Sequence, residues 1–215
     1  MSAVAIVFLF AASLVPSPKP KASAEKPIGP DAVFTPPANF VEALHEGCAA
    51  QSGDALGECF LAQMKKAGAS SAALDFTRRT GNLAYLGSLR ETGRVDVGLA
   101  VYPFRANENN VWLLVNGKPA IIDVGDTASV QKLLEPNPVY KAARIGNPKI
   151  AVFPRSTKEG PRVLPAKEGQ RFGVPYDLKE CHACKPVGYT AVAFVFDAAG
   201  NFVGPELGQV KPYYH

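Results

Sequence analysis

The chain has 215 residues, of which 47% are hydrophobic and 20% charged, and its formal net charge is +4. This is the composition of a globular protein, long enough to bury a sizeable core in one mid-sized domain or two small ones, and it excludes a disordered chain. The small charge excess gives no basis for nucleic-acid binding, which requires basic residues clustered on one face.

An apolar run at residues 3–15 is followed by a stretch rich in proline and lysine and then by Ala22-Ser23-Ala24. The run is about as long as the apolar region of a secretory signal peptide and too short to span a bilayer of roughly 30 Å. The three small residues fit the cleavage pattern of signal peptides, so we expect a signal peptide over residues 1–24. The run departs from that pattern in having no Lys or Arg before it, and a buried N-terminal strand or helix is the alternative.

No other segment contains ~18 consecutive apolar residues, the length that a membrane-spanning helix needs, so we expect no membrane span. A cleaved signal peptide directs the mature chain out of the cytoplasm. The predicted location is therefore periplasmic or secreted.

Residues 25–37 contain several prolines and a glycine, which predicts an extended linker. Helical spacing then begins near Asn39 and ends at Ser52-Gly53-Asp54, which interrupts the first helix and can cap a second one. A glycine at position 68 ends the second helix, and a third is expected at about residues 72–79. The apolar positions that fall on the core faces of the first two helices are Phe40, Leu44, Cys48, Leu56, Cys59, Phe60 and Met64. The following stretch, 82–89, is ambiguous between helix and irregular structure.

After residue 93 the hydrophobic period changes to the alternation typical of strands, at 95–101, 111–115 and 120–124. The second and third of these strands flank Asn116-Gly117, which predicts a two-residue hairpin turn with φ > 0 at both positions. These three strands should form a meander, followed by a short helix that Asp126 or Thr127 caps and that ends at Leu134.

Residues 137–170 are the least regular part of the sequence because they are rich in proline. Short strands are expected at 150–153 and 162–164, and the remainder is either a folded-over loop that faces a ligand or a mobile connection. A strand at 171–178 and a hairpin made of 189–196 and 202–207, with Gly200 in its turn, complete the chain.

Together these elements predict an α+β fold in a single domain over residues 38–215. A helical N-terminal layer at 38–90 would pack on an antiparallel sheet at 94–210, built from the meander and the C-terminal hairpin.

The four cysteines are an even number in a chain expected to reach an oxidising compartment, which favours two disulfides. Cys48 lies late in the first predicted helix and Cys59 early in the second, so the two would face each other in an antiparallel helix pair. A bridge between them would stabilise the fold by about 2–4 kcal/mol in the chain-entropy model. A separate redox site is the alternative for this pair.

The other two cysteines form the motif Cys181-His182-Ala183-Cys184, directly before the C-terminal hairpin. Over these four residues the motif resembles the active-site motif of the thioredoxin superfamily, which implies thiol–disulfide exchange. That chemistry places the first cysteine at a helix N-terminus, whereas Pro186 and Gly188 lead into a strand here. We therefore favour a structural disulfide between Cys181 and Cys184.

Two further interpretations of this motif remain open. Cys181, His182 and Cys184 could be metal ligands, although a closed zinc site requires four. The sequence Cys-x-x-Cys-Lys is also similar to a haem-attachment variant of multihaem nitrite reductases, but the chain contains no other haem motif.

Other polar residues fit structural roles better than catalytic ones. His45 lacks the second histidine of a metalloprotease helix, and Asp123 and Asp126 lack the remaining ligands of a calcium loop. We expect no cofactor. The prediction is an exported, disulfide-stabilised, non-catalytic binding or envelope-associated protein whose partner, a protein or a small molecule, contacts residues 137–170. The alternative is a redox or metal-binding protein that uses Cys181, His182 and Cys184.

Overall fold

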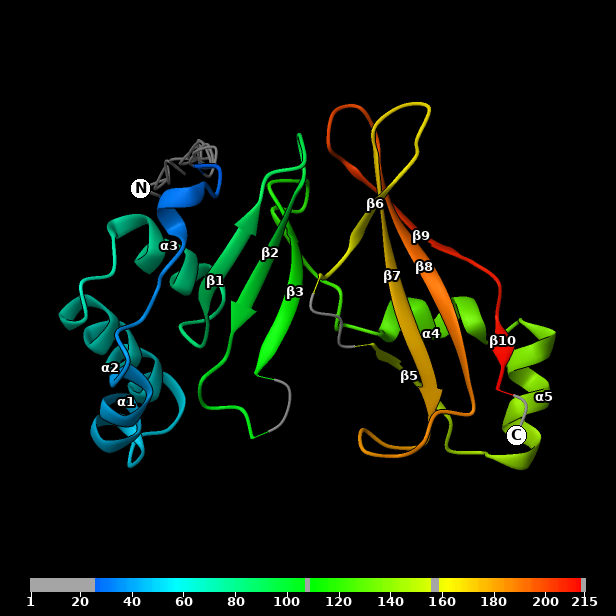
Figure 1. Cartoon of the computed structure of the whole chain (residues 1–215), viewed down its shortest axis with the longest axis horizontal. Coiled ribbons are helices and arrows are strands. Elements are labelled where there is room, and N and C mark those ends of the chain that lie inside the picture. The colour runs from blue at the N-terminus through cyan, green and yellow to red at the C-terminus, as the bar shows by residue number, and fades with distance from the viewer. Residues whose placement is uncertain (1–25, 107–108, 156–158, 214–215) are drawn as a thin grey trace, which may run out of the picture.

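The computed structural model describes residues 26–106, 109–155 and 159–213 (Figure 1). The predicted signal peptide lies outside these residues. The fold class is α+β, with three helices preceding two antiparallel sheets, which confirms the predicted class. Within the described ranges, no helix is long and apolar enough to cross a membrane.

The helical layer contains α1 (Phe40–Cys48), α2 (Gly53–Lys66) and α3 (Ser71–Arg79), close to the predicted positions. The Ser70 hydroxyl caps α3 by accepting a hydrogen bond from the Ala73 amide at 3.0 Å. Large apolar side chains hold the layer together, with Phe40, Leu44, Phe60 and Met64 fully or almost fully buried.

The segment before α1 is extended apart from the 3₁₀ turn η1 (Pro30–Ala32), and it forms part of the core. Ile28, Ala32 and Phe34 are buried, and the Phe34 amide donates to the Leu86 carbonyl at 2.8 Å. Three side chains of residues 26–37 therefore pack into the core of the domain, which an extended linker alone would not do.

The first sheet is a meander in the order β1-β2-β3-β4. Its strands are β1 (Tyr85–Arg90), β2 (Asp96–Val101), β3 (Asn110–Val115) and β4 (Ile121–Asp123). The ambiguous stretch at 82–89 thus forms most of an edge strand, and the helical part ends at Arg79 rather than at residue 90.

The turn between β3 and β4 differs from the predicted two-residue hairpin. Only Asn116 has φ > 0, and the strands resume pairing at Ile121, after a cis bond between Lys118 and Pro119. The longer loop follows from its contacts. Asn116 bonds to both backbone groups of Ile28, and a side chain at Gly117 would collide with Phe196.

The second sheet has the central order β10-β8-β7-β5, with β6 beside β7 and β9 beside β8. Its strands are β5 (Ala151–Pro154), β6 (Arg162–Leu164), β7 (Gln170–Lys179), β8 (Gly188–Phe196), β9 (Phe202–Leu207) and β10 (Lys211–Pro212). Two helices, α4 (Ala128–Leu134) and α5 (Pro138–Gly146), connect the sheets. The meander and the C-terminal hairpin therefore belong to two sheets rather than to one.

The predicted irregular region 137–170 is largely folded. Asn137 begins α5 by accepting bonds from the amides of Val139 and Tyr140, and Pro138 occupies the first helical position, where no amide donor is needed. The two short strands expected in this region appear as β5 and β6.

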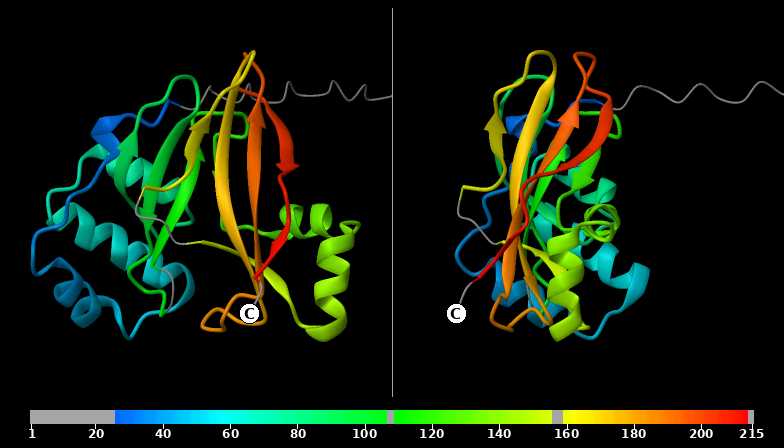
Figure 2. Two further views of the ribbon diagram at one scale, coloured as in Figure 1. Left: turned by 45° about the vertical axis from the view of Figure 1, so that its right-hand side comes forward. Right: turned by 90° about the vertical axis from the view of Figure 1, so that its right-hand side faces the viewer.

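The meander lies between the helical layer and the second sheet (Figures 1 and 2). Its two faces contribute to different cores, because successive residues of a strand point to opposite sides. Ala100 and Leu113 join the core beneath α3, whereas Val97 and Leu114 join the core shared with β7 and β8. The second sheet contributes Phe172, Val174, Tyr176, Leu178, Val192, Phe194 and Phe196 to this shared core.

Candidate functional site

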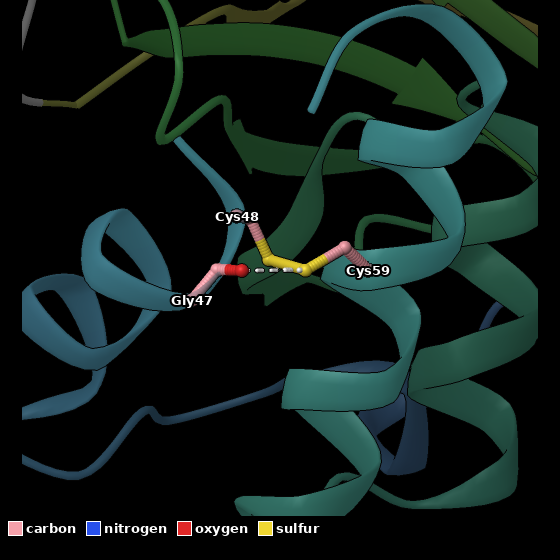
Figure 3. Close-up of a disulfide and its surroundings, with 3 residues drawn as sticks. All are labelled: Gly47, Cys48 and Cys59. Atoms are coloured by element: carbon pink, nitrogen blue, oxygen red, sulfur yellow. Dashed lines mark hydrogen bonds between the residues drawn. A yellow bond between two sulfur atoms is a disulfide. The ribbon is translucent and has the colours of Figure 1, made fainter. Parts of the chain in front are cut away.

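The disulfide between Cys48 and Cys59 joins the end of α1 to α2 (Figure 3). Its Cα atoms are 5.8 Å apart, and Cys48 is 0% exposed among the apolar side chains of the helical layer. The Cys59 sulfur also lies 3.5 Å from the Gly47 carbonyl oxygen. A disulfide sulfur carries no hydrogen, so this is a packing contact. The pair is bonded as expected, and its location in the core fits a structural staple.

The disulfide between Cys181 and Cys184 closes the connection between β7 and β8, with Cα atoms 5.0 Å apart. The Cys184 amide donates to the Cys181 carbonyl at 3.1 Å, and residues 180–187 form turns and bends without a helix. The helix N-terminus that activates a thioredoxin-type cysteine is therefore missing at this motif.

The metal interpretation requires thiolates, and a closed disulfide offers none. Across residues 26–106, 109–155 and 159–213, no group of three or more His, Cys, Asp or Glu side chains is placed to hold a metal ion. His182 lies beside an aromatic ring instead, since its imidazole meets Phe153 edge to face with centroids 5.8 Å apart.

Lys179 connects this loop to the neighbouring strand. Its Nζ donates to the His182 carbonyl at 2.7 Å and lies 5.2 Å from the centre of the Phe153 ring. Phe153 is on β5, two positions before Arg155, so both side chains point to the same side of the second sheet. The disulfide loop thus folds back over an edge of this sheet.

A second group of contacts surrounds Arg155. Its Nε and Nη2 donate to one oxygen of Asp177 at 3.0 and 2.6 Å, and Nη2 also donates to the Tyr213 hydroxyl at 2.6 Å. The hydrogen bond to Asp177 raises the pKa of Arg155 above its ordinary value. The rings of Tyr189 and Tyr213 lie 5.1 Å apart, and the Arg155 guanidinium is 5.7 Å from the Tyr189 ring.

These groups share the face of the second sheet that points away from the shared core. In β7, even-numbered residues such as Phe172 and Tyr176 are buried in that core, so odd-numbered residues point outward. We call the following residues the outer-face cluster: Phe153, Arg155, Asp177, Lys179, His182, Tyr189 and Tyr213. All are half-buried except His182, which is exposed.

The centre of the outer face is made of small side chains. In the β7–β8 register, Gly173 pairs with Ala193 and Pro175 with Ala191. Beyond this strip, Arg171 forms an ion pair with Glu206 of β9 at 2.5 Å. A strip of small side chains, with the Leu164 side chain of β6 packed beside Gly173, therefore separates the cluster from a second charged pair.

The other residues considered in the sequence have structural roles. Asp123 accepts from the Gly125 amide at 2.6 Å and Asp126 from the Ala128 amide at 3.3 Å, so both shape the turn before α4. Burial raises the pKa of Asp123. His45 is exposed on α1, with its ring 5.8 Å from that of Phe104.

A shallow hollow of about 260 Å³ lies between α2 and α3. Leu61, Ala62 and Leu74 line it, with Lys65, Arg78 and Glu58 at its sides. Arg78 pairs with Asp75 on α3, and Glu58 accepts from Asn82 in the turn after α3, so these two charges have partners at the hollow itself. This arrangement favours a gap between surface side chains over a built site.

No protein-family model, curated protein or solved structure matches this chain. The sequence identified the cysteine motif and His182 but not Phe153, Arg155, Tyr189 and Tyr213. The only signal for these residues was the alternation of β8, which places Tyr189 on an outward position.

Proposed function

We propose that the protein is an exported, disulfide-stabilised binding protein whose outer-face cluster contacts a protein partner. Two disulfides support the export part of the proposal, because disulfides persist in oxidising compartments and are rare in the cytosol. The contact region expected at residues 137–170 contributes Phe153 and Arg155 to the cluster.

The observation that carries the proposal is the arrangement of two tyrosines around a fixed arginine on the outer face of the second sheet. Tyr and Arg are enriched among the residues that dominate binding energy at protein interfaces. Asp177 and Tyr213 already hold the Arg155 side chain, so little rotamer freedom would be lost on binding. The adjacent strip of small side chains suits an extended protein surface better than a small ligand, which prefers a concave pocket.

The charge around the cluster indicates the chemistry of the partner. Arg155 is paired with Asp177, and the lysines next to the cluster in the sequence or in the sheet register, Lys179, Lys185 and Lys211, outnumber Glu180. Complementary potentials steer association, so the partner should present an acidic surface. Its association rate should therefore fall as the salt concentration rises.

Site-specific crosslinking in the native host would test the binding surface. A photoreactive phenylalanine analogue replaces Tyr189 in one variant and Val41, which is 48% exposed on α1, in a control variant. We expect one adduct of defined mass from position 189 and none of that mass from position 41.

Adding Arg155→Ala should reduce the yield of that adduct, since losing a dominant interface residue costs about 2 kcal/mol or more, roughly 30-fold in affinity. Identical adducts from both positions, or an Arg155→Ala variant with unchanged yield, would rule out this surface.

Export has a separate test in the N-terminal residue of the protein recovered from its host. Cleavage after Ala24 predicts a mature chain that begins at Glu25, with all four cysteines resistant to alkylation until a reductant is added. A cytoplasmic chain that retains residues 1–24 and reacts with alkylating reagent would contradict export.

A further inference from the structure

The two disulfides differ in how a thiol can reach them. In the helical layer Cys48 is 0% exposed and Cys59 is half-buried, whereas in the β7–β8 connection Cys181 is exposed and Cys184 half-buried. A thiolate must approach one sulfur directly for exchange to occur, so accessibility controls the rate. Thiol–disulfide exchange should therefore be faster at the bridge between Cys181 and Cys184.

The two bridges also constrain the chain to different extents. Cys48 and Cys59 are separated by 11 positions and join two helices, whereas Cys181 and Cys184 are separated by 3 positions within one connection. In the chain-entropy model the stabilisation grows with the logarithm of the loop length, so the shorter loop contributes less. Reduction of Cys181–Cys184 should thus cost the fold little.

We propose that the Cys181–Cys184 disulfide is a site of reversible reduction by a dithiol, and that Cys48–Cys59 is not. One thiolate of the dithiol attacks a sulfur of the bridge, which forms a mixed disulfide and releases the other cysteine as a thiolate. The second thiolate of the dithiol then attacks the sulfur of the dithiol that is bonded to the protein, and the second protein cysteine leaves as a thiolate. The products are two protein thiols and an oxidised, disulfide-bonded dithiol, so two electrons and two protons move to the protein.

Reduction would act on one half of the outer-face cluster. The bridge closes the loop that presents His182 to Phe153 and holds the His182 carbonyl against Lys179 at 2.7 Å. Below the loop, the Val187 amide donates to the Leu178 carbonyl at 2.8 Å, which anchors the hairpin independently of the bridge. Opening should therefore stay within residues 179–187.

The Arg155–Asp177 pair belongs to the sheet beneath this loop and should stay in place. The reduced protein would thus lose the His182 half of the cluster and keep the arginine half. This regulatory consequence rests on the proposed function of the cluster, whereas the exchange reaction does not.

The exchange reaction is tested on the whole oxidised protein with dithiothreitol as the probe. Samples are quenched with an alkylating reagent over time, and mass spectrometry measures the alkylated fraction of each cysteine pair. We expect Cys181 and Cys184 to react at least about tenfold faster than Cys48 and Cys59. Equal rates, or faster reaction of Cys48 and Cys59, would overturn the proposal.

Hydrogen exchange tests the predicted opening in the same samples. Reduction should accelerate exchange of peptides that cover residues 179–187 several-fold, without affecting peptides from α2. The double variant Cys181→Ser, Cys184→Ser should show the accelerated exchange without reductant and no further change with it. Unchanged exchange of these peptides on reduction would refute the opening, and neither measurement depends on whether a partner binds.

Discussion

Gln170 belongs to the first position of β7, yet its amide group binds the other sheet. Its oxygen accepts from the amides of Arg94 and Val95 at 2.9 and 2.7 Å, and its nitrogen donates to the carbonyls of Thr92 and Val95 at 3.1 and 3.0 Å. One side chain therefore satisfies the backbone of the β1–β2 turn and ties it to the second sheet.

Replacing Gln170 with alanine removes all four bonds at once. We expect the free energy of unfolding to fall by about 2–4 kcal/mol, because partly buried backbone groups lose their partners. Urea denaturation measures this change, with Gln209→Ala, an exposed glutamine, as the matched control. Similar small losses in both variants would show that water replaces Gln170.

Two aspartates should respond to pH with opposite signs. Burial raises the pKa of Asp123, so the folded protein binds its proton more tightly than the unfolded chain, and the ionised carboxylate reduces stability at neutral pH. Asp123→Asn keeps the oxygen that accepts from Gly125 and should raise the free energy of unfolding at pH 7. The gain should disappear as the pH falls below about 4, where the carboxyl is protonated in both states.

The pKa of Asp197 shifts in the opposite direction to that of Asp123. Hydrogen bonds from the Asn201 side chain and backbone, with smaller contributions from Ala199 and Gly200, lower its pKa. Its contribution to stability is present above the unfolded pKa and is lost as the pH falls through the folded value. Asp197→Asn should therefore destabilise the protein at pH 7 and have no effect in strong acid. Denaturation curves of Asp123→Asn and Asp197→Asn at pH 7 and in strong acid test both expectations. A change in the free energy of unfolding with the same sign in both variants at pH 7 would contradict them.

At the scale of elements, α1 depends on its disulfide. The helix has nine residues, which is short for a helix to be stable by itself, and Cys48 attaches its last turn to α2. The double variant Cys48→Ala, Cys59→Ala should lose about 2–4 kcal/mol of stability in denaturant. The variant Cys181→Ser, Cys184→Ser should lose less, and the reverse order would show that the terminal hairpin depends more on its bridge.

The sequence was most informative where periodicity is local. Helices α1 to α4, strands β2 to β9, and the pairing of Cys48 with Cys59 follow from local sequence patterns. Helix α5 was not predicted because the surrounding prolines indicated irregular structure, although Pro138 suits the start of a helix.

Contacts between residues far apart in the sequence could not be predicted. Asn116-Gly117 has the composition of a two-residue turn, but contacts with Ile28 and Phe196 impose a longer loop. The outer-face cluster likewise depends on Arg155 meeting Tyr213, which is 58 positions away. Local periodicity carries no information about such pairs.

For the whole molecule, the shared core predicts that the two sheets unfold together. Val97 and Leu114 of the meander pack with Phe172 and Phe194 of the second sheet, so neither sheet can lose its partner without exposing apolar surface. The helical layer is attached to the opposite face of the same meander, where Phe76 packs near Leu86. We therefore expect the whole domain to unfold in one cooperative transition.

Phe172→Ala tests this expectation. The side chain is 0% exposed and lies edge to face with Phe196 at 5.9 Å, so its removal should cost about 3–5 kcal/mol.

Fluorescence of Trp112, the single tryptophan and a residue of the meander, reports on the first sheet, while far-ultraviolet circular dichroism reports largely on the helices. In Phe172→Ala both transitions should shift together to the same lower denaturant concentration. Val203→Ala is the control, because Val203 lies in the same sheet and is 69% exposed, and it should shift neither transition. A Trp112 transition that stays at the wild-type midpoint in Phe172→Ala would mean that the meander and helices fold independently of the second sheet, and that the chain contains two domains.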